Sequence, residues 1–463
     1  MIDNDFLLQN EVAKEIYNNI KDLPIIDYHN HLSPLEIYEN KPFDNITNMW
    51  LQHDHYKWRL MRFSGIKEEN ITNINNKFEA FSSFVKSIEK AYLNPLYYWS
   101  HMELKTFFNV NEYLTRENTK EIYEKANRYL KNHPKGPREL LKDLKVEALC
   151  TTDDLNDDLK YHELLEKDPN FSIKVLPTFR PDKLFSFDTQ IFEENIIKLE
   201  EKTSIKVIDL NSLEKALSIR LDFFENHSCQ LADHGISYFK YHQTSFDQAN
   251  EIFLKRYNNL SLTILEIEIL NSYLLGFFLN EYSLRNWTVQ YHIGASRNNN
   301  TIGYENIGVD SGYDSITNHH FVDDFNRFLN DINTKCTLPR IIIYPLNSAS
   351  YEATAAMCAN FSEGLKGKIQ LGAAWWFLDN KRGIEKQLNI FAEFLNLNYF
   401  IGMVTDSRSF LSFVRHDYFR RILASFLAEK VEKGLIPKNM KKIAELAQNI
   451  SYNNTKNFIN FKR

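Results

Sequence analysis

The chain has 463 residues, of which 43% are hydrophobic and 25% are charged, a composition typical of a globular protein and not of a disordered one. Its 55 basic and 61 acidic residues give a net charge of -6, which offers no general attraction for nucleic acid or an anionic membrane. No apolar run is long enough to span a membrane, the first residues do not form a secretory signal, and the 4 cysteines lack CxxC spacing. We therefore expect a cytoplasmic protein with reduced cysteines.

Eight apolar runs, each ending in polar residues, divide the chain. Most are continuous, as in strands buried on both faces, and the segments between them have helical periodicity. Strands that alternate with helices indicate a parallel sheet, and eight of them favour an α/β fold of the (β/α)8 TIM-barrel type. A doubly wound open sheet is the alternative. The runs are residues 25–31, 146–153, 174–180, 236–242, 288–294, 340–346, 368–376 and 400–407.

The first two runs are separated by a long polar and aromatic stretch with helical rhythm. A βα unit needs only about 30 residues, so we predict a large helical insertion after the first strand. A smaller insertion is expected between Arg180 and Ser237. Residues 1–39 are predicted to form an N-terminal helix and the first strand, and residues 40–145 an insertion or lid. Residues 146–450 are predicted to form the remainder of a distorted barrel, and residues 451–463 a peripheral C-terminal tail.

The first run ends in two histidines, His29 and His31, separated by one residue. Alternate residues of a strand share a face, so both imidazoles can bind one divalent metal ion, or else make structural hydrogen bonds. Asp406, at the end of the eighth run, could complete a metal site or act as a base, or else cap a helix or pair with a cation. The first and eighth strands of a closed barrel are neighbours, so the barrel predicts that these three residues converge.

Further polar side chains follow other predicted strands. His292 ends the fifth run, where it could bind metal, donate a hydrogen bond to substrate or lie in the core. Arg180, Arg408 and Arg297 also follow strands, and a guanidinium at a barrel mouth suits bidentate recognition of a carboxylate, although surface arginines are usually solvated. Together the arginines favour an anionic substrate.

Aromatic and basic residues open the predicted insertion. They indicate either a lid, in which Tyr56 relays a proton and His55 contacts substrate, or an amphipathic helix packed on the barrel. Trp375, after the seventh run, lines the pocket or fills the core. Two polar clusters are interpreted as loops that bind substrate, brace the site or are simply solvated: Asp233-His234 and residues 310–314.

A joint pattern of short segments runs through residues 24–421. The segments are DYHNHLSP, TTDD, PTFRPD, ADHGI, HIGASRNNN, DSGYDS, AAWWF and GMVTDSRSFLSFVRHDYFRR, in this order. An HxH pair alone is unspecific, whereas HIGASRNNN and TDSRSF are highly specific. The set resembles the uronate isomerase (glucuronate isomerase) family of the amidohydrolase superfamily, over nearly the whole chain.

The resemblance implies a distorted (β/α)8 barrel with a helical insertion. It implies reversible interconversion of D-glucuronate with D-fructuronate and of D-galacturonate with D-tagaturonate, a step of hexuronate catabolism. It also implies that His29, His31 and Asp406 hold a divalent metal ion, often zinc in such enzymes.

Other roles follow from the same similarity. Arg180 and Arg408 match arginines that contact substrate, and Tyr56 matches a pocket tyrosine from the lid. His292 matches the superfamily histidine that follows the fifth strand. The resemblance leaves open whether this histidine contacts metal or substrate.

The sequence departs from its relatives at several positions. Asn30 stands where Cys is frequent, and Leu155 where Pro is frequent. Strand alternation turns Asn30 away from the metal, so neither change affects the chemistry.

Many superfamily hydrolases hold a carbamylated lysine after the fourth strand, but here Lys240 lies inside the predicted strand and His242 ends it. One metal ion is therefore expected instead of two.

The resemblance predicts an aldose–ketose isomerase that works through a cis-enediol(ate). Asp406 is the candidate base that moves a proton between C2 and C1, with Tyr56 or a water on the metal moving hydroxyl protons. The alternatives are a metal-dependent hydrolase of the same superfamily and a non-catalytic protein that binds sugar acids. The expected partner is a small uronate, without nucleic acid or membrane, and a homo-oligomer stays open.

Overall fold

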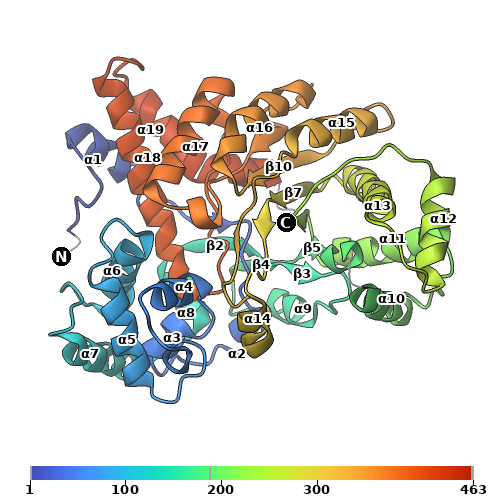
Figure 1. Ribbon diagram of the computed structural model, residues 1–463. Helices are drawn as coiled ribbons and strands as arrows, with labels where there is room; N and C mark the ends of the chain where they lie inside the picture. Colours follow the sequence, from blue (N-terminus) through green and yellow to red (C-terminus); the bar gives the residue numbers. More distant parts are fainter. Residues whose placement is uncertain (1–2, 187–188, 460–463) are drawn as a thin grey trace.

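The protein is a mixed α/β structure in which parallel strands lie in the middle and helices surround them (Figure 1). The computed structural model describes residues 3–186 and 189–459. Two parallel sheets have the strand orders β1-β2-β4 and β11-β10-β7-β6-β5-β3. The strands are β1 (Ile25–Asp27), β2 (Val146–Cys150), β3 (Asp153–Asp154), β4 (Lys174–Leu176), β5 (Thr178–Arg180), β6 (Leu231–Ile236), β7 (Thr288–Ile293), β8 (Ala295–Ser296), β9 (Ser315–Ile316), β10 (Arg340–Pro345) and β11 (Ile369–Leu371).

The two sheets are continuous because the second and third predicted strands are each divided in two. Pro177 separates β4 from β5 and has no N–H to donate to a ladder. On one side of this break the Thr151 N–H donates to the Leu176 carbonyl at 3.0 Å. On the other side the Thr178 N–H donates to the carboxylate of Asp153, also at 3.0 Å. A side chain thus replaces a backbone acceptor, and the parallel order continues from β1 through to β11.

The fourth predicted strand is wrong in position. The structure places the strand at β6, and the predicted run 236–242 is mostly the loop that follows it. The reason is that β6 contains Asp233 and His234, polar residues that break the apolar pattern but are buried by partners inside the protein. Lys240 consequently lies outside the strand, where its Nζ is 3.0 Å from the carboxylate of Asp324.

The eighth predicted run, residues 400–407, forms no strand. Its backbone groups bond partly to backbone and partly to side chains. The Asp406 N–H donates to the His29 carbonyl at 3.1 Å, so the segment does lie beside the continuation of β1. The Ile401 carbonyl instead accepts from the Thr455 hydroxyl at 2.6 Å. Such mixed partners replace a regular ladder.

Between β1 and β2 the described elements are helical, drawn in blue and teal in Figure 1. Their buried side chains, including Trp50 and Trp99, share one core cluster with β1, β2 and residues such as Tyr418 from the C-terminal helices. The helices up to this point are α1 (Glu11–Asn18), α2 (Pro34–Glu39), α3 (Ile46–Leu51), α4 (His55–Phe63), α5 (Lys77–Ile88), α6 (Pro95–Phe108), α7 (Thr119–Asn132) and α8 (Pro137–Asp143).

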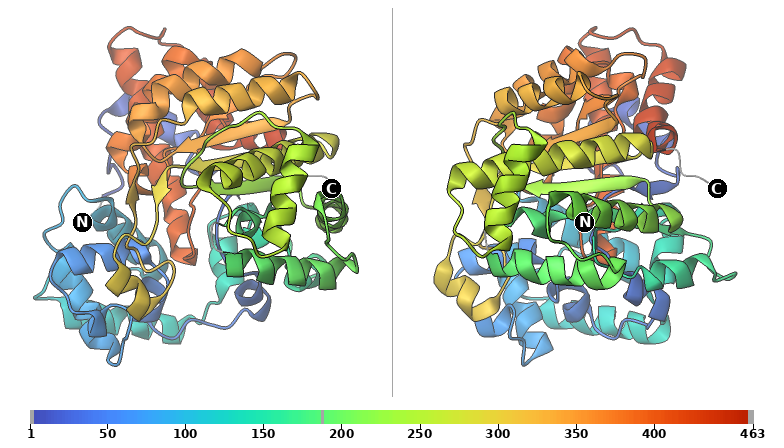
Figure 2. Two further views of the ribbon diagram at one scale, coloured as in Figure 1. Left: turned by 45° about the vertical axis from the view of Figure 1, so that its right-hand side comes forward. Right: turned by 90° about the vertical axis from the view of Figure 1, so that its right-hand side faces the viewer.

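The remaining helices cover the other strands, as the two views of Figure 2 show. A second core cluster lies under α10–α13 and α15 and contains Phe179, Phe278 and Phe325. These helices are α9 (Lys160–Glu166), α10 (Thr189–Thr203), α11 (Leu210–Asn226), α12 (Phe246–Tyr257), α13 (Ile264–Leu284), α14 (Thr301–Ile307), α15 (Val322–Asn333), α16 (Tyr351–Cys358), α17 (Lys381–Phe394), α18 (Val414–Glu432), α19 (Met440–Gln448) and α20 (Asn454–Ile459). Across the two described ranges, no helix combines the length and apolarity that crossing a membrane requires.

The last described residues, 449–459, pack against the eighth segment. Part of the predicted peripheral tail, up to residue 459, forms the π-helical turn η8 (Asn449–Asn453) and then α20. Thr455 and Phe458 are buried there. Residues 460–463 of that tail lie outside the described residues.

Gly402 lies where the eighth segment passes η8, and only a glycine fits. Its φ is 77°, and a Cβ would lie 2.4 Å from the backbone oxygen of Ile450. We expect Gly402→Ala to lower the free energy of unfolding by about 2–5 kcal/mol, since a left-handed backbone costs about 1–2 kcal/mol and overpacking about 1–3 kcal/mol. Gly434→Ala is the control, because Gly434 has φ 68° and no atom within 4 Å of the added carbon. Urea denaturation of both variants measures the difference, and equal losses would contradict crowding at Gly402.

Candidate active site

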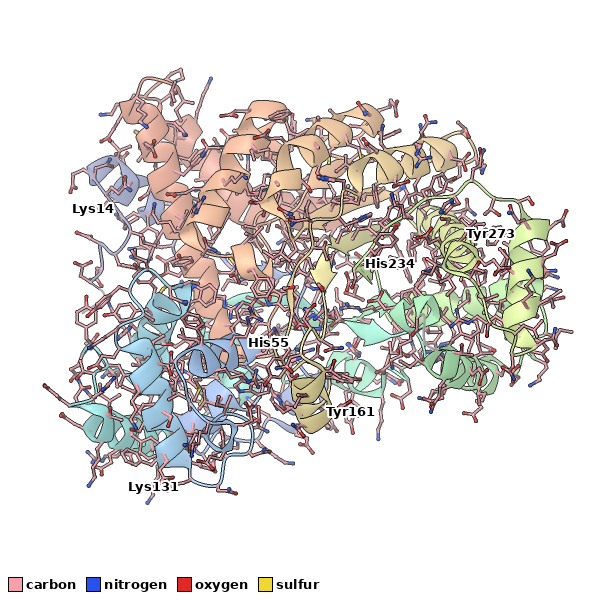
Figure 3. All side chains as sticks on the ribbon, viewed as in Figure 1. Lys14, His55, Lys131, Tyr161, His234 and Tyr273 are labelled. Carbon is pink, nitrogen blue, oxygen red and sulfur yellow. The ribbon has the colours of Figure 1, made fainter. Side chains whose placement is uncertain are left out.

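One cavity of about 400 Å³ collects the side chains predicted for the site at the carboxyl ends of the strands. Figure 3 shows His55 near the middle of the molecule, whereas Lys131 lies at the outer edge of the insertion. The predicted residues that line the cavity are His29, His31, His55, Tyr56, Arg180, His292, Arg297, Trp375, Asp406 and Arg408.

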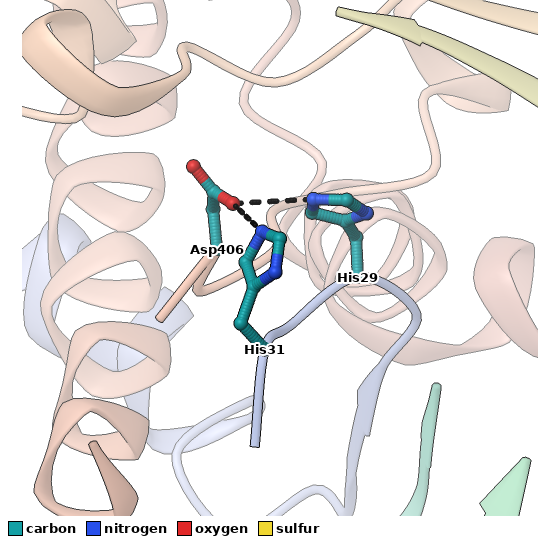
Figure 4. Close-up of side chains that lie close together, drawn as sticks. All are labelled: His29, His31 and Asp406. Atoms are coloured by element: carbon teal, nitrogen blue, oxygen red, sulfur yellow. Dashed lines mark hydrogen bonds and ion pairs between the residues drawn. The ribbon is translucent and has the colours of Figure 1, made fainter. Parts of the chain in front are cut away.

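At the base of the cavity, His29 and His31 converge on Asp406 (Figure 4). Both Nε2 atoms lie 3.1 Å from the same carboxylate oxygen, Oδ1. Burial alone would raise the pKa of Asp406, but the two histidines outweigh it and hold that pKa well below its usual value. Burial lowers the pKa of His31 to about 4, so this imidazole is neutral at pH 7 and offers a lone pair.

The backbone at Asp406 is held in an unusual conformation. Its φ is 45°, in the left-handed region that non-glycine residues avoid. The preceding residue, Thr405, is fixed on three sides. Its N–H and hydroxyl donate to the two carboxylate oxygens of Asp27 at 2.9 and 2.5 Å, and its carbonyl accepts from Arg415 at 3.2 Å. These buried contacts maintain the strain that turns the Asp406 carboxylate toward the histidines.

Neighbouring polar side chains orient both the imidazole of His31 and the carboxylate of Asp406. Thr152 Oγ1 lies 2.5 Å from Nδ1 of His31 and 3.3 Å from the Asn30 carbonyl. If its hydroxyl donates to that carbonyl, Nδ1 carries the imidazole proton and Nε2 keeps the lone pair. The Trp375 indole donates to Asp406 Oδ2 at 2.6 Å and leaves Oδ1 to the histidines.

A second chain of polar groups is centred on Asp233. The sequence analysis placed this residue in a loop that either serves the site or is solvated, but the carboxylate is fully buried and comes from β6, so the loop and its solvation were wrong. Its Oδ1 lies 2.6 Å from Nδ1 of His292, and its Oδ2 lies 3.1 Å from Arg180. Burial alone would raise the pKa of Asp233, but Arg180 and His292 lower it below its usual value. The motif ADHGI was the available signal, obscured because the strand was expected further along the chain.

The donor set fits a divalent cation. Two groups of three residues bring their ligand atoms within 4.8 Å of one another: His29, His31 and Asp406, and His29, Asp233 and His292. Nδ1 of His29 and Nε2 of His292 are buried without a hydrogen-bond partner in the described structure, although such atoms usually have one. Imidazole and carboxylate donors suit zinc and other transition metals alike, so the side chains fit a metal-dependent enzyme without selecting the ion.

The insertion contributes His55 and Tyr56 from the start of α4. Their rings stack at 5.1 Å, and Tyr56 also lies 5.0 Å from the Arg415 guanidinium. Burial raises the pKa of Tyr56 well above its usual value, so the hydroxyl stays neutral, and it has no hydrogen-bond partner among the described residues. A neutral, desolvated hydroxyl can donate to or accept from a substrate oxygen.

The arginines of the cavity differ in how strongly they are already paired. Arg180 contacts two carboxylates, Asp182 at 2.6 Å and Asp233 at 3.1 Å. Arg408 contacts Asp310 at 2.8 Å, and Arg297 lies 3.9 Å from the same carboxylate. Arg180 therefore has two carboxylate partners, of which Asp233 is buried, whereas Arg408 and Arg297 share a single carboxylate, Asp310.

Fold and site together define a class: α/β enzymes with a cation-binding set at the carboxyl ends of parallel strands and arginines around the cavity. Comparisons with known proteins give the particular family. A model of the glucuronate isomerase family matches residues 1–459. The uronate isomerase of Caldanaerobacter subterraneus subsp. tengcongensis is 43% identical and that of Clostridium perfringens 42%, covering 99% and 100% of this chain and 99% of each relative. The chain belongs to the glucuronate isomerase family.

Solved structures agree with this family. The uronate isomerase of Thermotoga maritima superposes with a TM-score of 0.93 at 33% identity, over 99% of both chains. The glucuronate isomerase of Caulobacter crescentus superposes with a TM-score of 0.91 over 100% of this chain and 98% of its own, and at 22% identity that likeness concerns the fold alone. The hydrolase alternative is not favoured.

The convergence on Asp406 generates a prediction about metal binding. We expect His31→Gln to weaken divalent-metal binding by about 100-fold or more, beyond the loss typical of outer partners, because one of three converging donors is removed. Metal content after dialysis against a competing chelator measures this for zinc, manganese and cobalt in turn. His133→Gln, an exposed histidine of the insertion, is the matched control. Unchanged metal retention in His31→Gln would contradict its role as a ligand.

Proposed function

We propose that the protein is an aldose–ketose isomerase that interconverts D-glucuronate with D-fructuronate and D-galacturonate with D-tagaturonate. The observation that carries this is the convergence of His29, His31 and Asp406 in a cavity that also holds Arg408, within a chain of the glucuronate isomerase family. A catalytic carboxylate and an anion-binding group then face one small space, as an acidic sugar requires.

The same reasoning supports a finer description of the fold. We propose a distorted (β/α)8 barrel in which residues 400–407 take the eighth strand position between β11 and β1. The hydrogen bond from Asp406 to His29 supports this position. Residues 40–145 would then be a lid subdomain between the first strand, in residues 1–39, and the rest of the barrel, in residues 146–450, followed by the tail 451–463.

A single divalent metal ion, with zinc as the first candidate, would be held by His29, His31 and Asp406. When bound, it supplies Lewis-acid stabilisation of negative charge that develops on the substrate carbonyl oxygen. Of the second group, His292 stays available to the substrate, because its Nε2 is buried and unpartnered while its Nδ1 faces Asp233.

The proton transfer is assigned to the residues around this space. Asp406 is ionised at neutral pH and takes the proton from C2 of the open-chain aldose, which leaves the electron pair in a C1–C2 double bond of the enediol(ate). It returns the proton to C1 to give the ketose. Tyr56 and His292 hold or move the hydroxyl protons at O1 and O2. His55 and Trp375 shape the wall of the cavity and keep water from the intermediate.

The substrate carboxylate is assigned to the arginines that remain accessible. Arg180 matches an arginine that contacts substrate in the family, but its two carboxylate partners satisfy much of its charge inside the protein. Arg408 and Arg297 are half-exposed to the cavity and share one carboxylate. We therefore assign the substrate carboxylate to Arg408, with Arg297 beside it, and assign Arg180 to the alignment of Asp233.

The isomerase proposal is tested by following ketose formation from D-glucuronate and D-galacturonate with metal-replete protein. We expect Asp406→Asn to lower kcat by about 10²–10⁴-fold, the range for loss of a general base.

Tyr56→Phe should lower kcat with little change in KM, since it removes a hydroxyl group that can move a proton but carries no charge. His133→Gln should retain full activity. Rapid hydrolysis of amides or esters without uronate turnover would support the hydrolase, and binding of uronates without turnover would support a binding protein.

A further inference from the structure

The ring of Tyr56 is held in the cavity wall without help from its own hydroxyl group. In the part of the chain that the structure describes, this hydroxyl is buried and has no hydrogen-bond partner. The orientation of the side chain therefore depends on contacts of its ring. His55 stacks on the ring at 5.1 Å, Trp99 meets it edge-on at 6.2 Å, and the guanidinium of Arg415 lies 5.0 Å from its centroid. A small movement of these neighbours would redirect the hydroxyl.

Arg415 ties this ring to two segments that shape the site. The side chain of Arg415 is only 3% exposed. Its Nη1 donates to the Thr405 carbonyl at 3.2 Å and to the carboxylate of Asp379 at 3.4 Å. Thr405 directly precedes Asp406, and Asp379 directly follows the turn η5 (Trp376–Leu378), whose first residue lines the cavity. The guanidinium is thus anchored to the segments after both the seventh and the eighth strand positions.

The same guanidinium contacts two aromatic rings of the insertion. It lies 4.0 Å from the ring centroid of Trp99 on α6, in addition to its contact with Tyr56 on α4. Burial alone would lower the pKa of Arg415, but Asp379 raises it above its usual value, so the group stays charged. A planar guanidinium can stack on aromatic faces while it donates hydrogen bonds in its own plane, whereas an ammonium group cannot. Arg415 therefore relates the position of the Tyr56 ring to that of the eighth segment.

We propose that Arg415 is a positioning residue that aligns the hydroxyl of Tyr56 with the carboxylate of Asp406. The inference rests on the proposed function only for the part that Tyr56 plays in proton transfer. Among the described residues that line the cavity, Arg415 is absent, so it acts through Tyr56 without touching the substrate. Alignment of this kind matters because a displacement of about 1 Å can lower a rate by about 10²-fold.

A double-mutant cycle tests this alignment. Arg415→Lys keeps the buried charge but lacks the planar fork, so it should lower kcat for D-glucuronate by about 10²-fold with little change in KM. In a Tyr56→Phe background the same substitution should lower kcat by only about tenfold or less, because no hydroxyl is left to misalign. Equal fold losses in the two backgrounds would show that Arg415 does not act through Tyr56, and would overturn the proposal.

A second variant keeps the cycle decisive if Arg415→Lys does not fold. The double substitution Arg415→Met with Asp379→Asn removes both charges of the buried pair, an exchange that proteins often tolerate. It removes the same contact with the ring of Tyr56, so the same loss of coupling is expected. Equal effects with and without the Tyr56 hydroxyl would again overturn the proposal.

A further measurement needs no turnover. With 3-fluorotyrosine incorporated at position 56, fluorine NMR reports on the surroundings of this ring directly. Arg415→Lys should shift and broaden the signal, and an unchanged signal would contradict the positioning role. If the signal changes but the wild-type protein does not isomerise uronates, the proposed function fails while the positioning of Tyr56 by Arg415 stands.

Arg421→Lys is the matched control, because Arg421 lies on the same helix, α18, and makes contacts of the same kind. Its guanidinium lies 4.5 Å from the ring centroid of Tyr17, and its Nε lies 2.8 Å from the carboxylate of Asp417. Tyr17 belongs to α1, so this substitution should change neither kcat nor the fluorine signal. A loss of kcat as large as that of Arg415→Lys would indicate general destabilisation and overturn the proposal.

Discussion

The carboxylate of Asp27 holds the site together, because its two oxygens bind the backbone and side chain of Thr405 inside the protein. This contact joins the first strand to the eighth segment, which has no regular ladder of its own. Arg415 completes it from α18 by bonding to the Thr405 carbonyl. Asp406 is then confined to a left-handed backbone, and its carboxylate faces the histidines that follow Asp27 by only a few residues. One buried carboxylate thus supports both sides of the cluster of His29, His31 and Asp406.

The helical insertion depends on buried charges as well. Lys57 lies 2.7 Å from Asp54 and 3.6 Å from Glu103, and burial raises the pKa of Glu103. Arg415 stacks on Trp99 of α6 at 4.0 Å while it bonds to the eighth segment. The same guanidinium therefore touches the insertion and the segment that carries Asp406. Because these groups are poorly solvated, the insertion is expected to stay docked when substrate enters.

Features that depend only on burial of apolar side chains or on the alternation of side chains along a strand could be predicted from the sequence. Continuous apolar runs such as 288–294 and 340–346 do form buried strands, and the HxH pair does meet Asp406. The fourth strand could not be placed, since Asp233 is an acid in a strand and is compensated only by residues distant in sequence. The pairing of Arg408 with Asp310 was equally hidden. It depends on a loop conformation that hydrophobic periodicity does not encode.

The attachment of residues 449–459 to the eighth segment makes the site depend on contacts between residues that are distant in the sequence. His29 and His31 precede Asp406 by 377 and 375 residues. Thr455, whose hydroxyl donates to the Ile401 carbonyl, follows Asp406 further along the chain. Contacts of such long sequence separation form slowly. The histidine pair therefore meets the carboxylate that completes it only through slow, long-range steps of folding.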